Sequence, residues 1–273
     1  SYRRYTVQFN GESRVKPWIK FGNNLTLSHD EKKSGDYNIR MAMASLPTQP
    51  IYNEDGSYSG PDSPAHQYSD IRNVIGTALI NGQNTTKGYN ILGNIFAEIT
   101  PVKHLVFKTT GGLDFKYWDN RSFSPKYNWK PIPNPLSNLY QDANKSTTLL
   151  WDNTLTYTNT FAQKHFLNVM VGTSAQNNVY SKINASVSNF LSDQQNQLSK
   201  GLENPTVGGT MNDWAILSFI GRLNYTYADK YLLTATVRRD GSSRFSKENR
   251  WGTFPSFSLA WRASNESFFP KNV

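Results

Sequence analysis

The residue types that most often perform catalysis or bind metals are few in this sequence and widely separated. The 273 residues include no cysteine, which excludes a disulfide, a thiolate nucleophile and a cysteine-ligated metal. The four histidines have no spacing typical of a zinc site; they are His29, His66, His104 and His165. The stretch Asp240-Gly241-Ser242-Ser243 has no histidine near it in sequence, so a polar glycine turn is favoured over a serine nucleophile. We therefore expect no enzymatic activity, no metal site and no cofactor.

A second kind of chemistry, the binding of sugars or peptides by aromatic side chains, is suggested by the segment around Trp129. Trp129 lies in a proline-rich stretch with Tyr127 and Tyr140. Flat aromatic faces bind sugar C–H surfaces and peptide side chains, and prolines stiffen a loop. Tyr127, Trp129 and Tyr140 are therefore the ligand-binding candidates of this segment. The alternative interpretation is that these rings only pack the loop onto its neighbours.

The overall composition excludes two classes of protein. Mean hydropathy is −0.61, and no stretch has the eighteen or so apolar residues of a membrane-spanning helix, so a helical membrane protein is excluded. The formal charge of +9 raises nucleic acid or an anionic membrane surface as partners. The charges do not cluster into a stripe, and we therefore expect no nucleic-acid binding. A transmembrane β-barrel fits this composition, because its lipid-facing and lumen-facing residues alternate.

Apolar and polar residues alternate with a period of two in nine stretches bounded by turn residues. We expect strands near residues 3–10, 18–28, 89–99, 105–118, 149–161, 166–176, 215–227, 231–240 and 254–262. Odd positions in these stretches are mostly apolar or aromatic, whereas eleven of the thirteen charged residues are even-numbered. The two exceptions are Arg3 and Arg239. This partition predicts an antiparallel sheet whose odd-numbered residues face lipid and whose even-numbered residues face a lumen.

The connections between the expected strands alternate in length. Short ones fall near 11–17, 100–104, 162–165 and 228–230, and long ones cover roughly 29–88, 119–148, 177–214 and 241–253. Short turns on one side and long loops on the other are typical of outer-membrane barrels. A soluble sandwich usually has short loops at both ends.

Aromatic residues gather at both ends of the expected strands. Near the short turns they are Tyr157, Phe161, Tyr225, Tyr227 and Tyr231, and at the opposite ends Tyr117, Trp118, Trp151 and Trp214. Two aromatic belts with Leu, Val and Ala between them indicate a membrane-spanning wall. The alternative is that these rings form the core of a soluble β-sheet.

The number of expected strands indicates that the sheet is incomplete. Nine is odd, whereas bacterial single-chain barrels have an even number of strands. An open sheet leaves two unpaired edges, which lipid cannot satisfy. We therefore expect further strands after the closing segment 268–273 and a sector of a larger barrel within this chain.

A series of short motifs follows in order between residues 217 and 269. The motifs are Gly221-Arg222-Leu223-Asn224-Tyr225, Asp229-Lys230-Tyr231-Leu232-Leu233, Arg239-Asp240-Gly241-Ser242-Ser243-Arg244-Phe245, Asn249-Arg250-Trp251-Gly252, Phe254-Pro255-Ser256 and Trp261-Arg262. In this order they resemble the SusC/RagA family of TonB-dependent transporters from the outer membranes of Bacteroidota. Weaker similarity to the same family extends over the rest of the chain.

The resemblance implies an all-β fold, with residues 1–273 forming one partial barrel domain of about nine strands within a 22-stranded antiparallel transmembrane β-barrel. It implies a plug in the lumen and a TonB-contacting N-terminal segment, both missing from this chain together with the later strands. It also implies the bacterial outer membrane as location and lipid bilayer as surroundings. Arg238 and Asp240, expected to face the lumen, would line the ligand path or anchor the plug.

Two functions remain open from the sequence. In the first, the chain is part of an importer of glycans or peptides that works with a SusD-like surface lipoprotein. In the second, it is a soluble or surface-attached β-rich carbohydrate-binding module. For the importer we expect loop 29–88 to contact the lipoprotein, because about 60 residues is far beyond the usual connection length. The alternative for this loop is a folded flap that packs only on its own barrel.

Overall fold

The computed structural model describes every residue except 35–38, 46, 48–49, 61–72, 130–132 and 271–273. In this part of the chain, nine strands form one antiparallel sheet in which each strand pairs with its neighbours in sequence. The strands are β1 (Tyr2–Lys16), β2 (Ile19–Ser34), β3 (Asn84–Val102), β4 (Leu105–Ser124), β5 (Asn138–Phe161), β6 (His165–Phe190), β7 (Gly201–Tyr227), β8 (Tyr231–Ser242) and β9 (Trp251–Trp261). The expected all-β antiparallel fold is confirmed.

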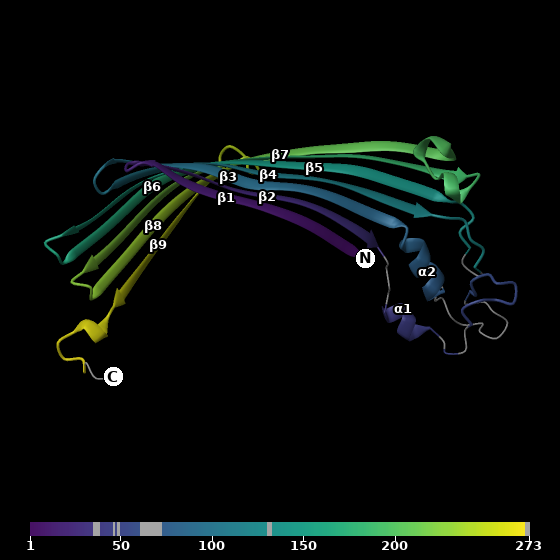
Figure 1. The fold of residues 1–273 in the computed structure, drawn as a ribbon, viewed down its shortest axis with the longest axis horizontal. Helices are drawn as coiled ribbons and strands as arrows, with labels where there is room; N and C mark the ends of the chain where they lie inside the picture. The colour runs from purple at the N-terminus through teal and green to yellow at the C-terminus, as the bar shows by residue number, and fades with distance from the viewer. Residues whose placement is uncertain (35–38, 46, 48–49, 61–72, 130–132, 271–273) are drawn as a thin grey trace.

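The sheet is long and curved, and the two α-helices of the described residues lie at one end of it (Figure 1). These are α1 (Ile39–Ala44) and α2 (Val74–Asn81), both in the connection between β2 and β3. Three short 3₁₀ segments lie at 193–195, 198–200 and 263–265. In the described residues, no helix has both the length and the apolar character needed to cross a membrane.

The register of the sheet keeps odd residues on one face and even residues on the other. Val169 of β6 pairs with Leu223 of β7, which pairs with Ala235 of β8, and the same parity holds from β1 to β9. The register shifts only near two short turns and between Ser186 and Ser188. Because side chains alternate between faces along a strand, two continuous faces result. We call them the apolar face, with odd-numbered residues, and the polar face, with even-numbered residues.

The two faces differ in packing as well as in chemistry. Large apolar side chains of odd number stand exposed, among them Phe257 at 79% and Leu259 at 76%. Most buried strand residues of even number are polar, such as Ser218 at 1% and Asn178 at 8%; the apolar side chain of Phe190 at the end of β6 is the exception among the described residues. Such inversion, with apolar residues outside and polar residues enclosed, is typical of a wall between lipid and an aqueous lumen.

The short connections are tighter than expected, and one predicted boundary is wrong. Residues 11–17 were predicted as a connection, but β1 continues to Lys16 and turns at Pro17 and Trp18. Gly11 and Ser13 lie there at odd positions, which carry apolar side chains elsewhere on the strand. The alternation that indicates a strand is therefore missing, although the backbone pairing with β2 continues. The predicted turn at 228–230 is confirmed, with left-handed φ angles of 49° at Ala228 and 54° at Asp229.

The strands are also longer than predicted at the end with the long loops. β5 begins at Asn138 instead of 149, β6 ends at Phe190 instead of 176, and β7 begins at Gly201 instead of 215. These extensions carry polar residues on both faces, because Asn144 pairs with Lys182 on one face and Lys145 pairs with Ser181 on the other. Leu139 and Val187, which also pair there, are buried in an apolar cluster. A strand with polar residues on both faces has only a weak period-two signal, so hydrophobic patterning does not predict its full length.

Candidate functional site

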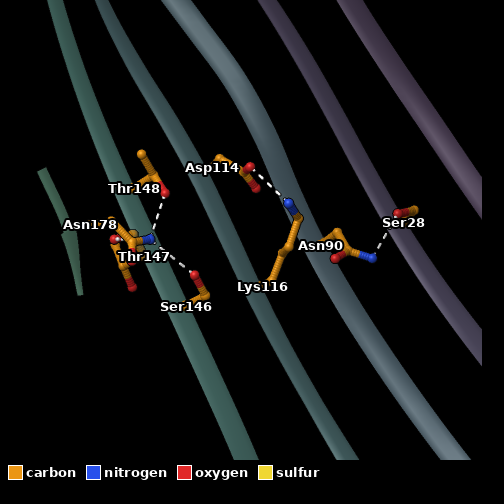
Figure 2. A network of polar contacts seen from close by, with 8 residues as sticks. All are labelled: Ser28, Asn90, Asp114, Lys116, Ser146, Thr147, Thr148 and Asn178. Atoms are coloured by element: carbon orange, nitrogen blue, oxygen red, sulfur yellow. Dashed lines mark hydrogen bonds and ion pairs between the residues drawn. The ribbon is translucent and has the colours of Figure 1, made fainter. Parts of the chain in front are cut away.

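The centre of the polar face carries groups of polar contacts on β2 to β6 (Figure 2). Asn178 of β6 donates from its side-chain amide to Thr148 Oγ1 at 2.8 Å and to Ser146 Oγ at 3.1 Å, both on β5. It also approaches the backbone oxygen of Thr147 at 3.4 Å. A buried amide must satisfy its donors within the protein. Asn178 therefore fixes how β5 and β6 present their side chains.

A separate group of polar contacts joins β2 and β3. Asn90 Nδ2 lies 3.2 Å from Asp30 Oδ1 and 3.4 Å from Ser28 Oγ. On β4, which lies between β3 and β5, Lys116 Nζ pairs with Asp114 Oδ2 at 2.9 Å (Figure 2). Exposed or half-exposed pairs of this kind contribute only about 0–1 kcal/mol each to stability. Their main effect is to set a pattern of alternating charge along the face.

Two carboxylate oxygens on this face are buried and lack a hydrogen-bond partner, Asp114 Oδ1 and Asp152 Oδ1. A buried acceptor without a partner costs about 1–3 kcal/mol. Both atoms belong to even-numbered residues near the middle of their strands. A donor that enters from the polar side reaches them only when the side chains that cover them move.

Beyond these contacts, toward the long loops, lies a cluster around Asp142. Asn120 Nδ2 donates to Asp142 Oδ1 at 2.8 Å, and Lys182 Nζ lies 3.8 Å from Asp142 Oδ2. The Lys182 ammonium is also 5.8 Å from the centre of the Tyr140 ring. Tyr140, a predicted ligand-binding residue, is thus a half-buried ring on the polar face beside a cation. This arrangement suits a ligand with both polar and apolar surface.

Arg238 and Asp240, the other predicted strand residues of the site, are brought together. Arg238 Nε donates to Asp240 Oδ1 at 2.7 Å and to Oδ2 at 2.9 Å. Its Nη2 lies 3.2 Å from Ser218 Oγ on β7. Both residues are on the polar face, as their even numbers predicted. The guanidinium is half-exposed, so it retains donors that point away from the sheet.

Trp129 and Tyr127 instead form the core of a folded unit in the long loops. Trp129 is only 7% exposed, stacks on Tyr127 at 4.2 Å between ring centres, and meets Tyr58 edge-on at 5.4 Å. A Cβ on Gly76 of α2 would lie 2.5 Å from the Trp129 ring. The structure therefore favours the packing interpretation for Trp129, with Tyr127 half-buried beside it.

The sequence did not single out one further group on the polar face, centred on Phe96. Lys108 Nζ lies 4.5 Å and Lys20 Nζ 5.7 Å from the centre of the Phe96 ring. The ring lies over Gly22, where any Cβ would collide with it. The sequence signal for this group is that Phe96 is an apolar residue at an even position, where the other strand residues, such as Lys20 and Lys108, are mostly polar or charged. Lys20 is paired with Glu12 at 2.9 Å.

The apolar face carries aromatic rings at both ends of the strands. Near the short turns, His165 Nδ1 lies 2.7 Å from the Tyr225 hydroxyl, and Tyr227 stacks with Tyr231. At the opposite ends, His29 stacks on Tyr89 with ring centres 4.5 Å apart. Two residues assigned to this second belt are not in it. Trp118 and Trp214 have even numbers and lie on the polar face, where Trp118 stacks on Tyr180.

A polar cluster locks the segment after β9 to the turn between β7 and β8. Glu266 accepts hydrogen bonds from Lys230 Nζ at 2.6 Å, the Tyr231 hydroxyl at 2.9 Å and Trp261 Nε1 at 3.2 Å. The bond from Lys230, followed by those from Tyr231 and Trp261, holds the pKa of Glu266 below its ordinary value of 4.5. A charged Glu266 therefore stabilises this end of the sheet.

Within the described residues, no group of three or more histidine or carboxylate side chains could hold a metal ion. The site features are thus a polar, alternately charged face, an opposite apolar face with aromatic ends, and long loops folded around Trp129. The arrangement can bind and guide a solute along a wall. It belongs to the class of transmembrane β-barrel proteins.

Similar proteins agree with this class. TonB-dependent receptor P26 of Formosa agariphila is 32% identical over 274 residues, which cover 97% of this chain and 27% of that receptor. TonB-dependent receptor P39 of the same organism is 34% identical, over 98% of this chain and 25% of the receptor. SusC of Bacteroides thetaiotaomicron is 52% identical over 67 residues, 24% of this chain and 6% of SusC. No protein-family model matches the chain.

Among solved structures, the RagAB peptide transporter superposes with a TM-score of 0.82 at 24% sequence identity. The superposition covers 97% of this chain and 30% of that chain, and it shows that the fold is that of a TonB-dependent receptor barrel. The sheet is therefore part of a transmembrane β-barrel in the bacterial outer membrane, and not the core of a soluble module.

The chain belongs to the SusC/RagA family of TonB-dependent receptors. It spans about a quarter of the length of the curated receptors that match nearly all of it, 27% of P26 and 25% of P39. These relatives are receptors rather than enzymes, in agreement with the expectation of no enzymatic activity.

Proposed function

We propose that the full-length protein is a TonB-dependent importer of oligosaccharides or peptides that works with a SusD-like surface lipoprotein. In this proposal the described strands form part of the barrel wall, with the apolar face toward lipid and the polar face toward the lumen. Contact with TonB belongs to a part of the protein outside this chain. No bond of the cargo is broken, because the receptor only binds and releases it.

The observation that carries this proposal is the chemistry of the polar face. Asp114 and Asp152 each hold a buried carboxylate oxygen without a partner, and both face the space that the barrel would enclose. Buried unpaired acceptors are rare in native proteins. Donor groups of a plug domain in the lumen would reach these covered oxygens once the neighbouring side chains rotate aside, and movement of the plug would expose a charged path along Arg238 and Asp240.

Ligand contact is proposed for Tyr140, Arg238 and Asp240, whose polar groups are accessible on the lumen side. Tyr127 remains a weaker candidate at the edge of the loop core. Trp129 acts on binding through the shape of the loop, since its own surface is covered.

Cargo and energy coupling are tested together in the native organism. A strain lacking the full-length gene is compared with its parent for growth on single purified oligosaccharides and on peptide mixtures, each with TonB present and depleted. We expect growth on one of the two cargo classes to require both the receptor and TonB. Equal growth of the deletion strain and its parent on every substrate would contradict the import proposal.

The partner surface is proposed to lie on α1, in the long connection between β2 and β3. Ile39 is 72% and Met43 is 83% exposed, and they are four residues apart on the same helix. Exposed apolar pairs of this kind are typical of protein contact sites. Part of the originally expected contact, residues 61–72, lies outside the described residues.

The contact is tested by co-purification of the lipoprotein with the full-length receptor. Ile39→Glu with Met43→Glu is expected to lower the yield of co-purified lipoprotein while the barrel assembles normally. Ile183→Glu is the matched control, because Ile183 is a 68% exposed apolar residue on β6. Undiminished co-purification, or equal loss in the control, would count against α1 as the contact.

A further inference from the structure

Arg239 is a cation on the face that otherwise meets lipid. It lies on β8 in register with Phe219 of β7, and both side chains are exposed on the apolar face. Its guanidinium carbon is 5.3 Å from the centre of the Trp251 ring, and Trp251 stacks on Phe219 with ring centres 6.0 Å apart. Among the ion pairs of the described residues, none involves Arg239. The charge is positioned by aromatic rings and is not neutralised.

The depth of Arg239 follows from its place on the strand. It is eight residues from Tyr231, which belongs to the aromatic belt near the short turns. A strand tilted by about 40° rises roughly 2.6 Å per residue along the membrane normal, so the separation is about 20 Å. The apolar band of an outer-membrane barrel is about 25 Å tall. Arg239 therefore lies near the outer-leaflet boundary, and its long side chain can reach the headgroup level.

An apolar groove runs from Arg239 across the neighbouring strands. Its floor follows a register row in which Phe107, Leu155, Val171, Gly221 and Val237 are successive partners on β4 to β8. Gly221 contributes no side chain, and this leaves space between Val171 and Val237. The groove is thus lined mainly by apolar side chains, with Asn153 and Thr173 among its polar residues, and Arg239 is the one charged residue in its lining.

We propose that Arg239, Trp251 and this groove bind a phosphorylated lipid of the outer leaflet. The phosphate accepts a charge-assisted hydrogen bond from the guanidinium, whose planar fork of N–H donors matches the geometry of phosphate oxygens. One acyl chain lies in the groove at Gly221, and Trp251 holds the guanidinium at the headgroup level. Charge complementarity is the deciding observation, because the Arg239 guanidinium has no ion-pair partner among the described residues and presents its N–H donors at the depth of the lipid headgroups. This inference depends on the outer-membrane location and not on the transported cargo.

The test uses the purified full-length receptor in detergent and measures lipid adducts by native mass spectrometry. The first comparison needs no variant: phosphorylated lipid A is titrated against the same lipid A after enzymatic removal of its phosphate. We expect the phosphorylated form to bind about tenfold more tightly, the effect of one charge-assisted hydrogen bond. Equal binding of the two forms would overturn the proposal.

Two variants localise the site. Arg239→Gln is expected to abolish the preference for the phosphorylated form, and Gly221→Leu is expected to weaken both forms by filling the groove. A Cβ at Gly221 meets only Val237 Cγ1, at 3.4 Å, so the larger side chain can be accommodated. Arg222→Gln is the control, because it removes the same charge from the polar face of the same hairpin. Lipid binding that is unchanged in Arg239→Gln, or lost equally in Arg222→Gln, would show that the lipid binds elsewhere.

Discussion

Leu223 gives the most direct test of which face meets lipid. It lies on the apolar face of β7, four residues from Tyr227 and four from Phe219, the exposed aromatic residues toward the two ends of the band. Its position is therefore close to the bilayer midplane. An arginine there costs about 2–4 kcal/mol, which corresponds to a decrease of roughly 30- to 700-fold in the ratio of assembled to unassembled receptor.

The matched control is Thr156→Arg, at similar depth on the opposite face. Thr156 lies on β5, five residues from Phe161, and pairs with Val106 and Met170. Its side chain faces the lumen, where the new charge stays hydrated, so we expect a change within about 0.5 kcal/mol.

The measurement is folding of the full-length receptor into lipid vesicles, followed by its heat-dependent mobility on gels. The same assay on outer-membrane fractions reports assembly in cells. Equal loss for Leu223→Arg and Thr156→Arg would refute the assignment of faces. Normal assembly of Leu223→Arg would refute it as well.

Two further predictions concern the ends of the sheet. Trp129→Ala removes a buried ring and should destabilise the folded unit of the long loops by about 3–5 kcal/mol. Protease should then cut the loops faster, while the heat-dependent mobility of the barrel is unchanged. Equal cleavage rates would contradict the packing role of Trp129. The lowered pKa of Glu266 means that its contribution is complete above the ordinary value of 4.5 and is lost as pH falls through the folded value. The urea concentration at the unfolding midpoint of the full-length barrel should therefore fall in acid for the unchanged protein, and it should fall by a smaller amount for Glu266→Gln. Identical acid sensitivity of the two proteins would exclude Glu266 as a contributor.

Much of the fold was predictable because its signal is local. Side chains of a strand alternate between faces, so a wall between lipid and water must alternate apolar and polar residues. Residues such as Leu217, Phe219 and Leu223 therefore predicted both the strand and its outward face. The same parity placed Arg238 and Asp240 on the polar face and identified Arg239 as an exception.

Other features depend on contacts between residues far apart in the sequence, and the sequence alone did not determine them. Asn178 looks like any polar strand residue until the register brings it to Ser146 and Thr148, about 30 positions away. The sequence left both ligand contact and loop packing open for Trp129, and its burial against Tyr58 and α2 favours packing. The strand extensions beyond the apolar band carry only a weak alternating pattern, because polar residues occur on both of their faces. Backbone pairing defines them instead. Local patterning thus determined which residues form the wall, whereas the cross-strand register decided which of them act together.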